Sequence, residues 1–147
     1  IINNAGIYSL LNNKYFKAIN LGITFEFEFF LNVDKLEVNM YKFSRALGIL
    51  LDNAIEEAEK CPQKIIKASF IRENRNSRSV ITIKNTYLNK DVDIEKIFKK
   101  GESGKENHFG IGLWEIQNYV KKSKNLDLYT SKTPDFFIQE LSIYDLK

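Results

Sequence analysis

The sequence is poor in cysteine. Among its 147 residues only Cys61 is a cysteine, which excludes a disulfide framework and a cysteine metal cluster within the chain. A single cysteine suits a reducing compartment. Cys61 stands directly before Pro62, and this position indicates the end of a helix rather than a catalytic nucleophile.

Long hydrophobic runs are also missing. No apolar stretch approaches the ~18 residues that are needed to span a bilayer, and no signal peptide is visible. Repeats, low-complexity tracts and linkers are absent, so residues 1–147 are expected to form a single domain. Because the chain begins at Ile1 without a methionine, we expect it to be a piece of a longer protein.

The sequence has no large excess of charge of one sign. Its net charge is +3 and its pI is near 8.8, with the basic residues spread along the chain. This excess suits an anionic ligand without identifying one. The hydrophobic content of 44% is typical of a globular domain, and the length is sufficient for a core without disulfides.

Hydrophobic periodicity predicts alternating helices and strands. Helices are expected over residues 3–20, 39–60 and 113–124, with a short one over 93–99. Strands are expected over residues 23–29, 64–72, 79–85, 126–130 and 136–143. Residues 73–77 would close a hairpin, and residues 133–135 would form a turn. The mixed order predicts an α+β fold, a two-layer α/β sandwich with the helices on one face of a mixed sheet.

Two asparagines occupy unusual places in these elements. Asn53 falls at the edge of the apolar face of helix 39–60, one turn before Glu57. Asn85 follows Ile81 and Ile83 in the same phase of its strand, so its amide should point inward where the strand ends. Taken alone, each has an ordinary alternative: a solvated asparagine on a helix flank for the first and a turn-forming asparagine for the second.

A polar, glycine-containing segment, GESGKENHFGIGL, covers residues 101–113 and leads into the last helix. Glycines at such a position tolerate φ > 0 and let backbone N–H groups approach a phosphate. Gly110 and Gly112 therefore indicate a phosphate-binding segment. By itself, a glycine pair before a helix more often belongs to an ordinary loop that binds no ligand.

Three motifs now stand in order: DNAIEEA at residues 52–58, IKNT at 83–86 and the glycine segment at 101–113. Together they resemble the GHKL, or Bergerat-fold, ATPase family. Within that family, several features resemble the catalytic domains of peptide-pheromone quorum-sensing histidine kinases of the AgrC and competence-receptor type. These features are LGILLDNAIEEA, the strand-end Asn in place of the usual Asp, the IFKKG run, and Leu-Trp after the last glycine.

The resemblance implies an ATP site with Mg²⁺. Asn53 matches the family asparagine that coordinates Mg²⁺, and Asn85 matches the residue that reads the adenine amino group. The family's second glycine box corresponds to Gly110, Ile111, Gly112 and Leu113. Ser103 and Lys105 occupy places where the lid of these kinases contacts phosphates, and Lys99 and Lys100 lie at its opening.

Four positions depart from the family pattern. Ile49 stands where many relatives carry a polar or acidic base, and Glu56 stands where several histidine kinases place a phosphate-binding lysine. Phe109 replaces an arginine, and His108 replaces a small residue. These departures do not fit an efficient ATP hydrolase. His108 is the only histidine, and we interpret it as a lid residue rather than the phosphoacceptor.

The implied function is that of a protein-histidine kinase catalytic domain, which moves the γ-phosphoryl group of ATP to a histidine on a dimerisation helix outside this chain. Alone, the chain is not expected to autophosphorylate. The expected partners are the dimerisation and phosphoacceptor helices of the same homodimeric receptor and a response regulator, with no direct nucleic acid. The chain could be a monomer by itself, and it would lie on the cytoplasmic side of the plasma membrane and reach the membrane only through the part that precedes it.

Two alternatives stay open. A GHKL-type ATP-gated conformational module, as in mismatch-repair, chaperone and gyrase ATPases, would need a catalytic acid on the Asn53 helix, and Ile49 argues against one. A basic interaction domain with a degenerate nucleotide pocket would need a positive stripe, which the even charge distribution does not show.

Overall fold

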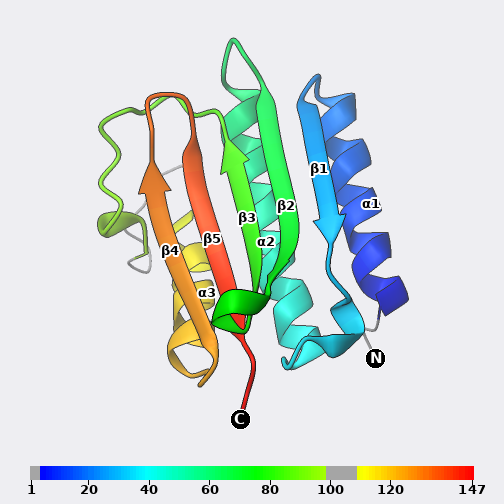
Figure 1. The fold of residues 1–147 in the computed structure, drawn as a ribbon. Coiled ribbons are helices and arrows are strands. Elements are labelled where there is room, and N and C mark those ends of the chain that lie inside the picture. The colour runs from blue at the N-terminus through cyan, green and yellow to red at the C-terminus, as the bar shows by residue number, and fades with distance from the viewer. Residues whose placement is uncertain (1–3, 99–108) are drawn as a thin grey trace.

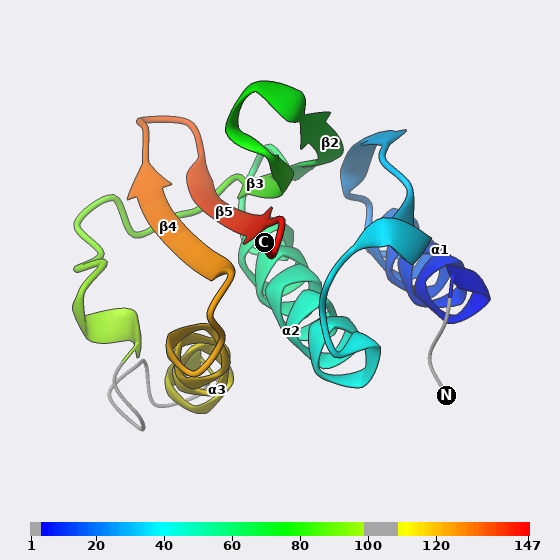
Figure 2. The same ribbon diagram turned by 60° about the horizontal axis from the view of Figure 1, so that its bottom comes forward.

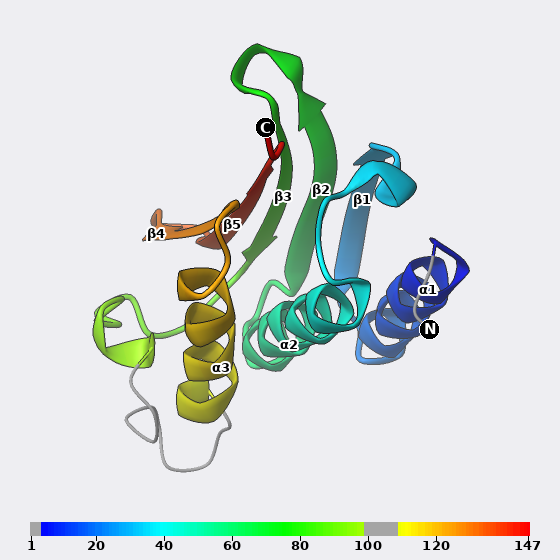
Figure 3. The same cartoon turned by 90° about the horizontal axis from the view of Figure 1, so that it is seen from below.

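The computed structural model describes residues 4–98 and 109–147 and folds them into two layers. One layer is a five-stranded sheet in the order β1-β2-β3-β5-β4, and the three α-helices lie together on one of its faces (Figures 1 and 3). The elements are α1 (Asn4–Asn20), β1 (Thr24–Phe30), α2 (Met40–Glu59), β2 (Ile65–Glu73), β3 (Arg78–Asn85), α3 (Phe109–Lys121), β4 (Leu126–Lys132) and β5 (Phe137–Tyr144). The predicted α+β sandwich is confirmed.

The sheet is mixed because the connection from β1 to β2 crosses over through α2, which leaves these two strands parallel. β1 runs parallel to β2, whereas the β2·β3, β3·β5 and β4·β5 pairs are antiparallel. β2 and β3 form the predicted hairpin, which closes through a short 3₁₀ helix, Asn74–Asn76. β3 is the central strand, so its last residue, Asn85, pairs with Ile66 on one side and Phe137 on the other. The end of β3 is therefore rigidly held.

Helix α2 supplies most of the helix side of the core. Its apolar residues recur at helical spacing, and Phe43, Leu47, Leu51 and Ile55 are at most 1% exposed. The Asn39 side chain caps the helix by accepting a hydrogen bond from the Lys42 backbone amide at 3.0 Å. Because an apolar stripe this wide must be covered, α2 packs across the middle of the sheet, with α1 and α3 on its two sides (Figure 2).

Helix α1 is held to α2 by charge as well as by packing. The Nζ atoms of Lys14 and Lys17 lie 2.8 and 3.5 Å from Asp52 Oδ1. On β1, Phe25 and Phe29 contact the rings of Tyr15 and Tyr8 on α1, but Phe27 is 40% exposed, so this edge strand is covered less completely than its alternating pattern predicts. None of the helices within residues 4–98 and 109–147 is long and apolar enough to cross a bilayer.

The last helix differs most from the prediction. α3 begins at Phe109, four residues before the predicted start at 113, and it ends at Lys121 rather than 124. Because glycine has a low helix propensity, the sequence favours a helix that starts after Gly112. Packing of α3 against α2 overrides this preference. The predicted short helix at 93–99 is a 3₁₀ helix, Lys96–Phe98, that contacts α3.

Candidate functional site

The site is built on the flank of α2 that faces α3. Ile49 lies against Gly112 in the first turn of α3, and Arg45, one turn earlier, forms a two-pronged ion pair with Glu115. Arg45 precedes Ile49 in α2, whereas its partner Glu115 follows Gly112 in α3. The two helices are therefore antiparallel. The hydrogen bonds to Glu115 also raise the pKa of the Arg45 guanidinium above its ordinary value.

Asn53 follows Ile49 by one helical turn on this flank, and it therefore lies beside the beginning of α3. Its side-chain nitrogen Nδ2 is buried and has no hydrogen-bond partner among the described residues. A buried amide without a partner costs about 1–3 kcal/mol. The N-terminus of α3 brings backbone N–H groups to the same region. This combination suits an acceptor-rich or anionic ligand.

Gly112 brings the two helices into close contact. A Cβ atom at this position would approach Ile49 Cγ2 to 3.0 Å, which is tighter than an ordinary van der Waals contact. Gly112 is helical, and the positive-φ glycine of the described residues is Gly22. Tolerance of φ > 0 is therefore not used at Gly112. The close approach of α3 to α2 is the reason that glycine is needed here.

Asn85 points inward at the end of β3, as predicted, and is 3% exposed. Its Nδ2 donates a hydrogen bond to the Thr86 carbonyl at 2.9 Å, and no described residue donates to its Oδ1. Thr86 is itself fixed, because its backbone amide and Oγ1 are both bonded to the Ile65 backbone. The sequence patterns did not reveal this role of Thr86. The result is a positioned acceptor at the rim of the core.

The remaining predicted site residues divide into two groups. Lys99, Lys100, Ser103 and Lys105 lie outside the described residues, as does His108. Gly110 and Ile111 belong to the first turn of α3. Leu113 is 1% exposed and packs in the core, so only its backbone can face a ligand.

Two of the acidic residues near Asn53 are already engaged. Asp52 pairs with α1, and Glu57 pairs with Lys60 at 3.2 Å. Within residues 4–98 and 109–147, no three His, Cys, Asp or Glu side chains are placed to hold a metal ion. A divalent cation at this site would therefore need ligand atoms from a bound molecule in addition to any from Asn53.

Comparisons with known proteins agree with this architecture. A sequence profile described as the GHKL domain matches residues 38–144. No curated protein sequence matches the chain. Among solved structures, the nucleotide-free catalytic domain of histidine kinase ThkA superimposes with a TM-score of 0.76 at 19% identity, covering 98% of this chain and 93% of that one.

Two further structures extend the comparison. The Acinetobacter baumannii histidine kinase AdeS gives a TM-score of 0.71 at 14% identity, over 94% of this chain and 62% of that one. Full-length ShkA, in complex with AMPPNP, gives 0.72 at 11% identity, over 93% of this chain and 28% of that one. At these identities the likeness concerns the fold. The profile match spans most of the sequence, and this chain therefore belongs to the GHKL domain family, with the fold of histidine kinase catalytic domains.

Proposed function

We propose that this chain is the ATP-binding catalytic domain of a sensor histidine kinase. Its membership of the GHKL family and the fold that it shares with ThkA support this proposal. One observation carries it: the buried Nδ2 of Asn53, which has no partner among the described residues, lies beside the start of α3, in the same helix layer that covers the buried end of β3 at Asn85. One molecule with a polar ring at one end and phosphates at the other would satisfy both asparagines.

Asn85 would bind the adenine end. Its Oδ1 has no donor from the described residues, and the bond from its Nδ2 to Thr86 holds the amide plane in place. A carbonyl oxygen so oriented accepts a hydrogen bond from an exocyclic amino group, without the charge assistance that an aspartate gives. This favours adenine over guanine, which presents a carbonyl oxygen at the corresponding ring position.

Asn53 and the start of α3 would bind the phosphate end. In the observed orientation, Asn53 Nδ2 is the unpaired atom and can donate to a phosphate oxygen. Turning the amide by 180° exchanges its nitrogen and oxygen, and the oxygen is a ligand of the kind that Mg²⁺ accepts. The residues present therefore fit the cation. Mg²⁺, when bound with the nucleotide, would neutralise phosphate charge.

Phosphoryl transfer rather than hydrolysis fits the α2 flank. Ile49, one turn before Asn53, is an apolar residue that packs against Gly112, so this position holds no base that could activate water. The same observation argues against an ATP-gated conformational module. The protein's contribution would be to orient the nucleotide and exclude water, and the attacking group would be a histidine outside this chain.

The wider setting belongs to the same proposal. By its sequence motifs, the chain would serve a peptide-pheromone quorum-sensing receptor of the AgrC or competence-receptor type. Its partners would be the receptor's dimerisation and phosphoacceptor helices and a response regulator, on the cytoplasmic side of the membrane.

The test is a calorimetric titration of the chain with ATP, with and without Mg²⁺. We expect saturable binding that Mg²⁺ strengthens and that GTP does not reproduce. Joined to a dimerisation helix that carries the phosphoacceptor histidine, the chain should then place an acid-labile phosphate on that histidine. Absence of saturable Mg·ATP binding at millimolar concentrations would contradict the proposal. Binding without transfer would leave an ATP-binding GHKL domain that is not a kinase.

A further inference from the structure

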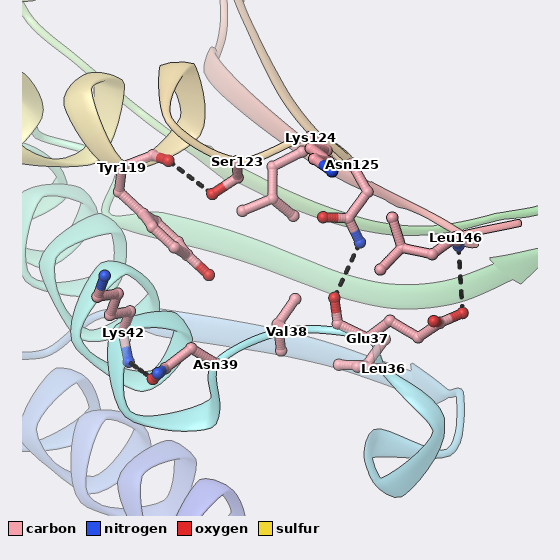
Figure 4. Close-up of a pocket in the computed structure, with 11 residues that line it drawn as sticks. Leu36, Glu37, Val38, Asn39, Lys42, Tyr119, Ser123, Lys124, Asn125 and Leu146 are labelled. Carbon is pink, nitrogen blue, oxygen red and sulfur yellow. Dashed lines mark hydrogen bonds between the residues drawn. The ribbon is translucent and has the colours of Figure 1, made fainter.

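A polar cavity lies at the far end of the α2 and α3 pair from Asn53. It is open to solvent, has a volume of about 550 Å³ and is lined by the segment that enters α2, the last turn of α3, the start of β4 and Leu146 (Figure 4). The antiparallel packing explains its position, because the end of α3 reaches the beginning of α2. A volume of this size is in the range of small-molecule sites.

Most of the polar groups in the cavity wall have partners. Asn125 Nδ2 donates to the Glu37 carbonyl at 2.8 Å, and Glu37 Oε1 accepts the Leu146 amide at 3.2 Å. Ser123 Oγ donates to the Tyr119 carbonyl at 2.7 Å, and Asn39 caps α2. These bonds, which are drawn in Figure 4, hold the wall together and engage its one carboxylate, Glu37, with a backbone amide.

Three hydrogen-bond donors in the same wall have no partner among the described residues. The hydroxyl oxygen of Tyr119 is buried and unpaired, and Figure 4 shows this side chain directed away from α3, toward Val38. Lys42 and Lys124 line the cavity and are exposed to solvent, and their ammonium groups form no ion pair with a described residue. A solvent-open cavity bordered by donors that have no partner among the described residues, two of them cationic, matches a ligand that is rich in acceptors.

We propose that this cavity binds a small organic anion with at least two negative charges, carried by carboxylate or phosphate groups. Two cations balance two charges, and the Tyr119 hydroxyl supplies a neutral hydrogen bond between the cavity wall and the ligand. The apolar side chains of Leu36, Val38 and Leu126 would cover its carbon skeleton. The simpler alternative is that the cavity holds only water and the lysines are solvated.

Amide-resolved NMR titration of the chain tests the proposal with three probes: citrate, inorganic phosphate and, as a neutral control, succinamide, all at constant ionic strength. We expect saturable shifts at the amides of Lys42, Ser123 and Asn125 with at least one anion and none with succinamide. Citrate and phosphate separate the two ligand classes, because a carboxylate site of this volume should prefer citrate.

Variants locate the binding. Lys42→Met with Lys124→Met should weaken the anion by about tenfold or more, since each removes a charge-assisted contact. Tyr119→Phe should weaken it severalfold while keeping the ring in place. Lys121→Met is the matched control, because Lys121 lies on α3 with Tyr119 but does not line this cavity. It should leave the anion affinity unchanged.

Two outcomes would overturn the proposal. One is the absence of saturable shifts at tens of millimolar anion, which means that the cavity holds only water. The other is binding that the Lys42, Lys124 and Tyr119 variants leave unchanged. Asn53→Ala should preserve the anion binding, so a failure here is distinguishable from a failure of the nucleotide proposal.

Discussion

Gly112 on α3 and Ile49 on α2 lie so close that one added carbon at Gly112 would stand 3.0 Å from Ile49 Cγ2. This contact sets how near the first turn of α3 comes to the asparagine flank of α2. Gly48, in contrast, has room for a methyl group, because its Cβ would meet Leu10 Cδ1 at 3.7 Å. The two helical glycines therefore offer a matched pair.

We expect Gly48→Ala to raise the free energy of unfolding by about 0.5–1 kcal/mol, the usual gain in helix propensity. Gly112→Ala should gain less than this, or lose stability, because its methyl group must push Ile49 aside. Denaturant unfolding measures both. In a chain that also carries Ile49→Ala, Gly112→Ala should give the full gain in stability, and the gain from Gly48→Ala should be unchanged. Equal gains at the two glycines would show that the close approach imposes no cost.

Asn53 should contribute to binding and not to stability. Because its buried Nδ2 has no partner among the described residues, Asn53→Ala removes an unsatisfied group and should leave the free energy of unfolding unchanged or raise it by up to about 1 kcal/mol. The same variant should weaken Mg·ATP by about tenfold or more. The exposed Glu59→Ala on the same helix controls for helix propensity. A clear loss of stability would mean that Asn53 is structural.

Asn85→Asp should make stability depend on pH. The Asn85 amide donates to the Thr86 carbonyl in a buried place, and an ionised carboxylate there would face another oxygen. A protonated carboxyl can still donate, so the folded state raises the pKa of the introduced group. Relative to the parent chain, stability should be nearly unchanged at low pH and fall by about 1–3 kcal/mol at neutral pH.

Unfolding measured at pH 4.5 and pH 7.5 checks this dependence. Asn13→Asp, at an exposed position on α1, should show little difference between the two conditions. A penalty for Asn85→Asp that does not change with pH would indicate that the cost is one of packing and not of charge.

Tyr119 should destabilise the chain at high pH. Burial raises the pKa of its hydroxyl from 10 to about 12. In the unfolded chain the hydroxyl ionises near pH 10, so ionisation favours unfolding as the pH rises from about 10 to about 12, and below this range Tyr119 has no such effect. Tyr119→Phe should reduce this loss of stability.

Unfolding curves from pH 8 to pH 11.5, with an ultraviolet titration of the tyrosines, measure the effect. Tyr129→Phe is the control, because Tyr129 is 61% exposed. If the two variants behaved alike, the hydroxyl of Tyr119 would be reached by solvent in the folded state.

Much of the fold followed from local pattern. The alternation in β3 predicted that Asn85 points inward, and the stripe on α2 predicted that Asn53 lies at the rim of the core, because both periods are properties of regular backbone geometry. The motifs around these asparagines also predicted the GHKL family. Boundaries were less accurate: the start of α3 was missed by four residues, since glycine propensity and packing on α2 oppose each other there.

The sequence alone thus determined the two-layer architecture and which asparagines stand at its edges, because these depend on residue spacing within single elements. Only the tertiary structure decided that Gly112 is needed for its closeness to Ile49, that Asp52 is engaged by α1, and that Tyr119, Lys42 and Lys124 line one cavity. Those relationships join residues far apart in the chain, and they arise from how antiparallel helices and the sheet pack together.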